Sequence, residues 1–294
     1  MNTNNLLSHR NKEPERGVLY IVGTPIGNLE DISLRASNIL KKVSLIACED
    51  TRITGKLLKN ISISNKLVSF HQYSSKDKLG FLISKLKGGD SIALVSDAGM
   101  PLISDPGYHL VRETKNNNFD VICIPGPCAA ITALVSSGID TTKFTFYGFL
   151  PKKNLDRELI LNEINESNKT SIIYESPKRI IKLLFELKNL CGGDRKLVLS
   201  KELTKRFEKH FGDNIAEVID MVQESNPKGE YTLIISGTQK DKNDNLISNQ
   251  NLVVNLQELI KAGLSHSAAA NYLSKKSGHS KNELYNLILK SKLE

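Results

Sequence analysis

The chain lacks the features of several protein classes. It has no tryptophan, and only 6% of its 294 residues are aromatic, too few for an RNA-binding sheet that stacks bases on rings. No apolar run approaches the ~18 residues of a membrane span, and residues 1–16 contain no apolar core of a signal peptide. We therefore expect a cytoplasmic protein with no membrane association, in which residues 1–16 are a disordered leader.

Several catalytic motifs are also absent. There is no P-loop, no G-x-G-x-x-G after the first predicted strand and no G-x-S-x-G nucleophile elbow. No H-E-x-x-H and no C-x-x-C occurs, so we expect no metal site. The four cysteines are predicted to be buried, reduced thiols; they are Cys48, Cys123, Cys128 and Cys191.

The charge balance is moderately basic. The formal net charge is +8 and the pI is about 9.1. A basic surface suits a polyanionic partner such as nucleic acid. A genome rich in A and T also encodes many lysines, so charge alone leaves this partner open.

The first half of the chain alternates short apolar runs with helical patterns, which predicts an open, parallel α/β sheet. One helix is expected after Asp31 as N-cap, and a second after Ser75, ending at Gly88. The expected strands cover residues 18–22, 43–48, 67–70, 91–95 and 121–124.

The second half alternates less regularly, which favours a second α/β domain with a mixed sheet. Ser176 is expected to cap a helix with Pro177 at its first position, and Asn214 with Glu217 resembles a capping box. The expected strands cover residues 144–149, 171–175, 197–200, 207–211 and 231–236, and the helices 180–187 and 215–222.

These patterns give five segments. After the leader, we expect an N-terminal α/β domain (17–127) and a second α/β domain (128–237). A polar linker (238–250) leads to a small helical module (251–294), with Ser265 and Ser280 as helix caps. The module resembles a helix-turn-helix unit, but a packing or dimerisation appendage fits its pattern equally well.

Four segments rich in glycine and proline follow predicted strands, at residues 23–28, 96–107, 124–130 and 174–179. Ligands of open α/β sheets bind beyond the carboxyl ends of the strands. One such loop is ordinary turn structure, but four at one edge predict a ligand site. Asp97 is expected to accept hydrogen bonds from the ligand, whereas Asp105 is expected to cap the helix that starts near Pro106.

Other polar groups follow strands too. Glu49 and Asp50 follow the second strand, where an acidic residue can hold a ribose, but a simple ion pair with Arg52 is the favoured interpretation. His71 follows the third strand, where a structural role is the more common one. Clustered cations suit either phosphate contacts or a solvated face; they are Lys178, Arg179, Lys201, Lys205 and Arg206.

The order of these segments is distinctive. LYIVGTPIGNLEDI, CEDTR, VSDAGMPLISDPG, IPGPCAA, YESPKR and SKELTK occur in succession. Together they resemble the tetrapyrrole-methylase-type (class III) methyltransferases, over about residues 17–237 plus the C-terminal module. The branch that they resemble most implies transfer of a methyl group to the ribose 2′-hydroxyl of a cytidine in 16S ribosomal RNA, in the decoding region of the small subunit.

The resemblance also implies a two-domain fold, a homodimer and S-adenosylmethionine as cofactor. The implied cofactor contacts are Pro25, Ile26, Asp97, Ala98, Gly99, Met100, Cys128, Ala129, Tyr174 and Gly229. Cys128 departs from the serine usual at its position, which weakens any hydroxyl contact but preserves a backbone contact. The expected RNA contacts are Arg52, Lys178, Arg179, Lys205 and Arg206.

Methyl transfer from a sulfonium needs alignment in a dry cleft and no metal, while the hydroxyl acceptor is helped by a base. The catalytic candidates are Asp50, Glu175 and Lys201, with Glu202 as a further candidate base. Two alternatives stay open. One is C-methylation of a tetrapyrrole precursor by the same fold. The other is a non-enzymatic protein that binds nucleic acid through its helical module.

Overall fold

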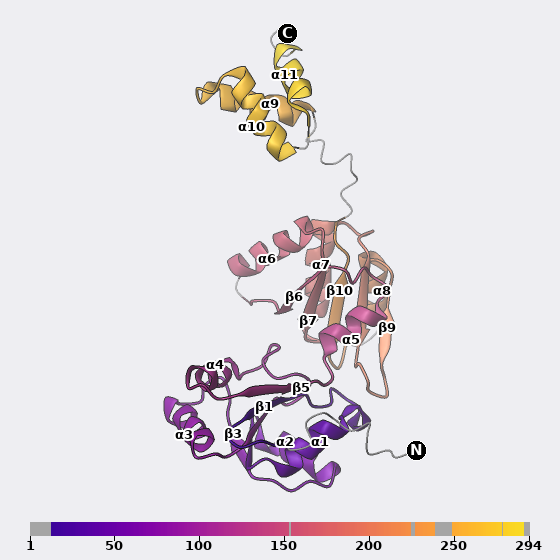
Figure 1. Cartoon of the computed structure of the whole chain (residues 1–294). Coiled ribbons are helices and arrows are strands. Elements are labelled where there is room, and N and C mark those ends of the chain that lie inside the picture. The colour runs from indigo at the N-terminus through magenta and orange to yellow at the C-terminus, as the bar shows by residue number, and fades with distance from the viewer. Residues whose placement is uncertain (1–12, 153, 225–226, 239–248, 278, 291–294) are drawn as a thin grey trace, which may run out of the picture. The chain divides into compact units, whose positions relative to one another are not determined.

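A computed structural model describes residues 13–152, 154–224, 227–238, 249–277 and 279–290 (Figure 1). The chain divides into two compact units, Met1–Gly237 and Thr238–Glu294. Most of the expected leader and linker lie outside the described residues. Within the described part, no helix is both long and apolar enough to cross a membrane.

The first sheet is open and entirely parallel, as the alternating pattern predicts. Its strand order is β3-β2-β4-β1-β5. The strands are β1 (Leu19–Val22), β2 (Leu45–Cys48), β3 (Leu67–Ser69), β4 (Ile92–Val95) and β5 (Val121–Ile124). The helices are α1 (Leu34–Lys42), α2 (Thr51–Asn60), α3 (Lys76–Lys87) and α4 (Tyr108–Asn116), preceded by the 3₁₀ turn η2 (Leu29–Asp31).

Alternate strand residues face opposite layers of helices. On one face, Tyr20 and Ile46 are buried with side chains of α1 and α2. On the other, Leu19 and Leu94 are buried with α3 and α4. Because both faces are covered, the strands are continuously apolar. The loops after their carboxyl ends form the edge at which such sheets bind ligands, called the working edge below.

The second sheet is mixed, in the order β6-β7-β10-β8-β9, and only the β6–β7 pair is parallel. Helices α6, α7 and α8 share a core on one face, and α5 packs on the other. The strands are β6 (Phe144–Phe149), β7 (Thr170–Glu175), β8 (Leu197–Lys201), β9 (Lys209–Phe211) and β10 (Tyr231–Ile235). The helices are α5 (Ala129–Ser136), α6 (Asn154–Glu166), α7 (Ile180–Cys191) and α8 (Ile215–Glu224).

Three predicted helix caps are wrong. Helix α1 is capped by Ser33 rather than Asp31, because residues 29–31 close the η2 turn first. The N-cap of α4 is Gly107, whose φ of 132° redirects the chain, so Asp105 remains in the preceding loop. Ser176 does not cap α7, since its hydroxyl donates to Glu175 and Arg179 occupies the N-cap position.

Other caps agree with the prediction. The Ser75 hydroxyl accepts from the Lys78 amide at the start of α3, and Gly88 ends that helix. Asn214 and Glu217 exchange hydrogen bonds at the start of α8. All four cysteines are free, but only Cys48 is buried, and Cys123, on the edge strand β5, is exposed. The prediction that all four are buried is therefore wrong.

The C-terminal unit contains α9 (Asn249–Lys261), α10 (His266–Ser277) and α11 (Lys281–Lys290). Leucines of α9 and α11 meet Ala269, Ala270 and Leu273 of α10 in a core of its own. Ser265 and Ser280 cap α10 and α11 as predicted. The three-helix module therefore has its own hydrophobic core.

Candidate functional site

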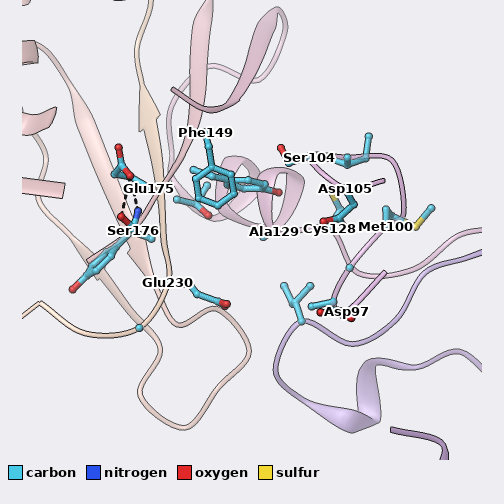
Figure 2. Close-up of a pocket in the computed structure, with 18 of the residues that line it drawn as sticks. Asp97, Met100, Ser104, Asp105, Cys128, Ala129, Phe149, Glu175, Ser176 and Glu230 are labelled. Carbon is cyan, nitrogen blue, oxygen red and sulfur yellow. Dashed lines mark hydrogen bonds between the residues drawn. The ribbon is translucent and has the colours of Figure 1, made fainter. Parts of the chain in front are cut away.

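A cavity of about 420 Å³ opens between the working edge of the first sheet and the second sheet (Figure 2). The first sheet contributes the segments that follow β1, β2, β4 and β5. The second contributes the end of β7 and the start of β10, which are neighbours because these strands are antiparallel. The volume lies in the range of small-molecule sites.

Close backbone contacts hold the first-sheet loops together. A Cβ added to Gly23 or Gly126 would lie 2.7 Å from the Cα of the other glycine, so neither position has room for a side chain. Thr24 and Gly99 exchange two backbone hydrogen bonds, of 2.9 and 3.1 Å. Three loops that are far apart in the sequence are thereby fixed as one surface.

This surface is acidic. Glu49, Asp97 and Asp105 all line the cavity, and Figure 2 shows Asp97, Met100 and Asp105 opposite Phe149, Glu175 and Ser176. Burial raises the pKa of all three carboxyl groups. The charge of Asp97 adds to the effect at Glu49 and Asp105, and the charge of Asp50 adds to it at Asp97. Asp97 accepts a hydrogen bond of 3.1 Å from the Asp50 amide. Among the described residues, none of the three forms a salt bridge.

The second-sheet wall is aromatic. The Tyr174 ring meets Phe146 edge to face, at a centroid distance of 5.0 Å, and Phe149 in a tilted arrangement, at 5.6 Å. Its hydroxyl accepts a hydrogen bond of 2.9 Å from the Ala130 amide, and burial raises its pKa. This bond ties β7 to the start of α5. Cys128 is the N-cap residue of α5 and makes no side-chain capping bond there.

The carboxylates on this wall have cationic partners. Glu175 lies 3.1 Å from the Arg179 guanidinium and accepts a bond from the Ser176 amide. Lys205 donates to Glu202 and Glu230, each at 2.9 Å. Burial opposes the ionisation of Glu202, but bonds from Lys205 and the Glu230 amide outweigh it and lower the Glu202 pKa.

Nine of the ten expected cofactor residues line the cavity; the tenth, Pro25, does not. Glu175 lines it as well, but Asp50 and Lys201 do not. Asp50 caps α2 and pairs with Arg52 at 2.6 Å, and the hydrogen bonds from Arg52 lower the Asp50 pKa to about 2. The Lys201 ammonium lies over the ring of Tyr231, 5.8 Å from its centre.

None of the five expected RNA contacts lines the cavity. Arg52, Arg179 and Lys205 are in ion pairs, although Arg52 is exposed. Lys178 and Arg206 are exposed and form no ion pair within the described residues. The Arg206 guanidinium lies 5.6 Å from the centre of the Phe207 ring. The geometry therefore leaves Lys178 and Arg206 as the more available cations of this set.

Several cavity residues were missed from the sequence. Asp105 was assigned to a helix cap, whereas Glu49 was recognised as an acidic residue directly after a strand, although it was not among the expected cofactor contacts. Phe149 and Thr232 belong to strands whose facing side depends on the second sheet. Glu230 follows Gly229, where a Cβ would collide with the Glu202 carboxylate.

Comparison with known proteins assigns the family. The sequence pattern described as Tetrapyrrole (Corrin/Porphyrin) Methylases matches residues 18–219. The chain belongs to the tetrapyrrole methylase family. Solved structures with a similar fold include a cobalt precorrin-4 methyltransferase, with a TM-score of 0.56, 14% identity, and coverage of 75% of this chain and 95% of that one. A uroporphyrin-III-C-methyltransferase from Thermus thermophilus has a TM-score of 0.52 and 18% identity, covering 75% and 94%.

This tetrapyrrole methylase has relatives with much higher sequence identity. The protein named Ribosomal RNA small subunit methyltransferase I in Haemophilus influenzae is 44% identical over 92% of this chain and 95% of its own length. The protein of the same name in Synechocystis is 41% identical over 93% and 98%. That of Vibrio cholerae is 49% identical over 75% and 77%. The similarity thus extends well beyond the family pattern.

Proposed function

We propose that this tetrapyrrole methylase transfers a methyl group from S-adenosylmethionine to the ribose 2′-hydroxyl of a cytidine in 16S ribosomal RNA. The observation that carries the proposal is identity above 40% to ribosomal RNA small subunit methyltransferases I, over more than 90% of both chains. The solved tetrapyrrole methylases, at 14% and 18% identity, share the fold alone.

The cavity fits the donor chemically. S-adenosylmethionine supplies, when bound, an electrophilic methyl group on a positively charged sulfur. Glu49 and Asp97 are partly buried and form no salt bridge in the described residues, which suits a cationic ligand, since each carboxylate then gains the counter-charge that burial demands. The residues that would hold it are Ile26, Asp97–Met100, Cys128, Ala129, Tyr174 and Gly229.

The residues of the cavity contribute to the proposed reaction mainly by positioning the two reactants. The Gly23–Gly126 contact fixes the acidic wall, and Tyr174 with Phe149 forms an apolar wall opposite it. Together they are placed to align two reactants for an in-line displacement. Among the candidate bases, only Glu175 lines the cavity, and its carboxylate is held by Arg179.

The setting follows from the same proposal. We place the reaction on the small ribosomal subunit in the cytoplasm. We also propose a homodimer, which is supported by Ile131 and Val135, one turn apart on α5 and 43% and 69% exposed. Light scattering on the purified chain would give the mass of two copies. A single-copy mass would contradict the dimer alone.

The test uses radiolabelled S-adenosylmethionine and small subunits that lack the modification, followed by mapping of the labelled nucleotide. We expect label on the 2′-oxygen of one cytidine. Label on a porphyrinogen with none on RNA would replace the proposed acceptor with a tetrapyrrole. Nucleic-acid binding with no transfer to either acceptor would favour the non-enzymatic alternative.

A further inference from the structure

A second cavity, of about 710 Å³, lies beside the first. It is formed by the segment after β3 and by the loop that leads into α4. The linings of the two cavities have Ser104 and Asp105 in common. The wall between them therefore carries one hydroxyl and one carboxylate.

The side chains that line the second cavity are of the types that proteins use to hold an unstacked nucleotide. His71, Tyr108 and His109 supply planar rings, and those of Tyr108 and His109 meet edge to face at 5.6 Å. Tyr108 is 59% exposed, so its ring is available to a base. Proteins bind unpaired bases by stacking them on such rings and by hydrogen bonds to their edges, for which Gln72 is suited.

Charge in this cavity also suits RNA. Lys76 lines its rim, is exposed, and forms no ion pair within the described part of the chain. A lysine at that place suits a phosphate of the RNA backbone. Among the described residues, by contrast, no lysine or arginine lines the first cavity. The two cavities therefore differ in the ligand that their charges favour.

The shared wall is held in an unusual conformation. Leu102 and Ser104 have φ values of 74° and 65°, a region that costs free energy for residues other than glycine. Gly148, at the bulge of β6, gives Ser104 room, because a Cβ there would lie 2.6 Å from the serine hydroxyl. Packing from the second sheet thus fixes the loop that carries Asp105.

We propose, building on the proposed methyl transfer to RNA, that the second cavity binds the acceptor nucleotide and that Asp105 is the catalytic residue that takes its 2′-hydroxyl proton. The 2′-oxygen bonds to the methyl carbon while the bond from that carbon to the sulfonium sulfur of the donor breaks. The electron pair of the broken bond stays on sulfur, which becomes a neutral thioether. The proton passes to the Asp105 carboxylate and then to water.

Asp105 is better placed than the other carboxylates. Asp97 and Glu49 line only the first cavity, and Glu175 is paired with Arg179. Burial raises the pKa of Asp105 and the charge of Asp97 adds to it, while a hydrogen bond with Ser96 acts in the opposite direction. A raised pKa makes the carboxylate a stronger base at neutral pH.

The first experiment tests the binding site. Tyr108→Ala should weaken equilibrium binding of unmodified small subunits by about 5- to 100-fold, the loss of one base stacking on a ring. Affinity for S-adenosylmethionine, measured by calorimetry, should change by less than about twofold. Phe185→Ala, on the exposed side of α7, is the control and should alter neither affinity. Subunit binding that survives both Tyr108→Ala and His71→Ala would overturn the site.

The second experiment tests the base. With saturating subunits and donor, Asp105→Asn should lower the single-turnover transfer rate by about 10²- to 10⁴-fold. Both affinities should stay within about threefold. The wild-type rate should rise with pH as the Asp105 carboxyl loses its proton, and this rise should disappear in the variant. The variant keeps the other titratable groups around the two cavities, which are Glu49, Asp97, His71, His109 and Lys76. Asp220→Asn, exposed on α8, is the matched control.

Two results would refute the role of Asp105. One is a variant rate within threefold of wild type. The other is a loss of donor affinity as large as the loss of rate, which would place Asp105 in the donor site alone. If the wild-type protein itself transfers no methyl group to RNA, the proposed function fails. Wild-type transfer with unaffected variants refutes only this inference.

Discussion

The two walls of the first cavity treat their carboxylates differently. On the first-sheet wall, Glu49, Asp97 and Asp105 are partly buried without a salt bridge in the described residues, and their pKa values are raised. On the second-sheet wall, Glu175 has Arg179, and Glu230 has Lys205. Both walls contain carboxylates, but only on the second-sheet wall are they paired with cationic side chains of the described residues.

The difference between paired and unpaired carboxylates indicates which wall has a structural role and which binds ligands. A paired carboxylate fixes a loop and needs nothing more. An unpaired, partly buried carboxylate weakens the fold and remains useful only where a ligand or a proton supplies the missing charge. We therefore assign the binding and proton chemistry to the first-sheet wall, and the shaping of the cavity to the second-sheet wall.

The largest loss of stability is expected from a substitution that separates the loops of the first-sheet wall. Gly126→Ala places a Cβ against the backbone of Gly23, where no flexible side chain is available to move aside. We expect a loss of about 2–3 kcal/mol in the free energy of unfolding, as for other overpacked sites. Urea unfolding would measure it, and donor affinity should fall as well.

Gly80→Ala provides the control for this prediction. Gly80 lies within α3, and a Cβ there meets nothing within 4 Å. The same substitution should stabilise that helix by about 0.5–1 kcal/mol. Equal effects at Gly126 and Gly80 would show that the contact of the two loops does not hold the wall.

The next effect concerns the charge of the first wall. Asp97→Asn should weaken binding of S-adenosylmethionine by about 10- to 100-fold, the value of a charged hydrogen bond. Because burial raises the Asp97 pKa, the folded state loses stability as pH rises from the unfolded to the folded pKa. The variant should therefore melt at a higher temperature than wild type at pH 7.

Calorimetry and thermal unfolding at pH 7 would test both parts. Asp220→Asn serves again as control, with neither property changed. Tight donor binding by Asp97→Asn would mean that the unpaired charge is not the reason for affinity, and the contrast between the walls would lose its functional meaning.

The smallest effect is expected on the second wall. Lys205→Met keeps the packing of the side-chain stem near Gly27 but removes the partner of Glu202 and Glu230. The pair is partly exposed, so the loss should be at most about 1 kcal/mol after solvent screening. The lowered Glu202 pKa contributes stability above its unfolded pKa, and this is lost as pH falls through the folded pKa.

Urea unfolding at pH 7 and in acid would check the prediction for Lys205. The difference between variant and wild type should be present at pH 7 and vanish in acid. A difference that persists in acid would assign the effect to packing rather than to charge.

Much of the fold was predictable because its signals are local. Continuous apolar runs indicate strands buried on both faces, and all five strands of the first sheet lie within the expected ranges. Ser75 and Gly88 delimit α3 through contacts a few residues away. Helices α2, α5 and α6 were not predicted, since α2 follows the acidic segment directly and α5 is apolar nearly all round.

The sequence by itself determined the α/β class, the loops that meet at the working edge and most of the first-cavity lining. The Asp50–Arg52 pair was predictable from the sequence, but only the tertiary structure decided which carboxylates pair over longer distances. Glu202 and Glu230 are 28 residues apart, yet Lys205 contacts both, and Asp105 enters the cavity wall because Gly107 delays the start of α4. Burial and pairing depend on neighbours brought from distant parts of the chain, and a local pattern of residues does not contain that information.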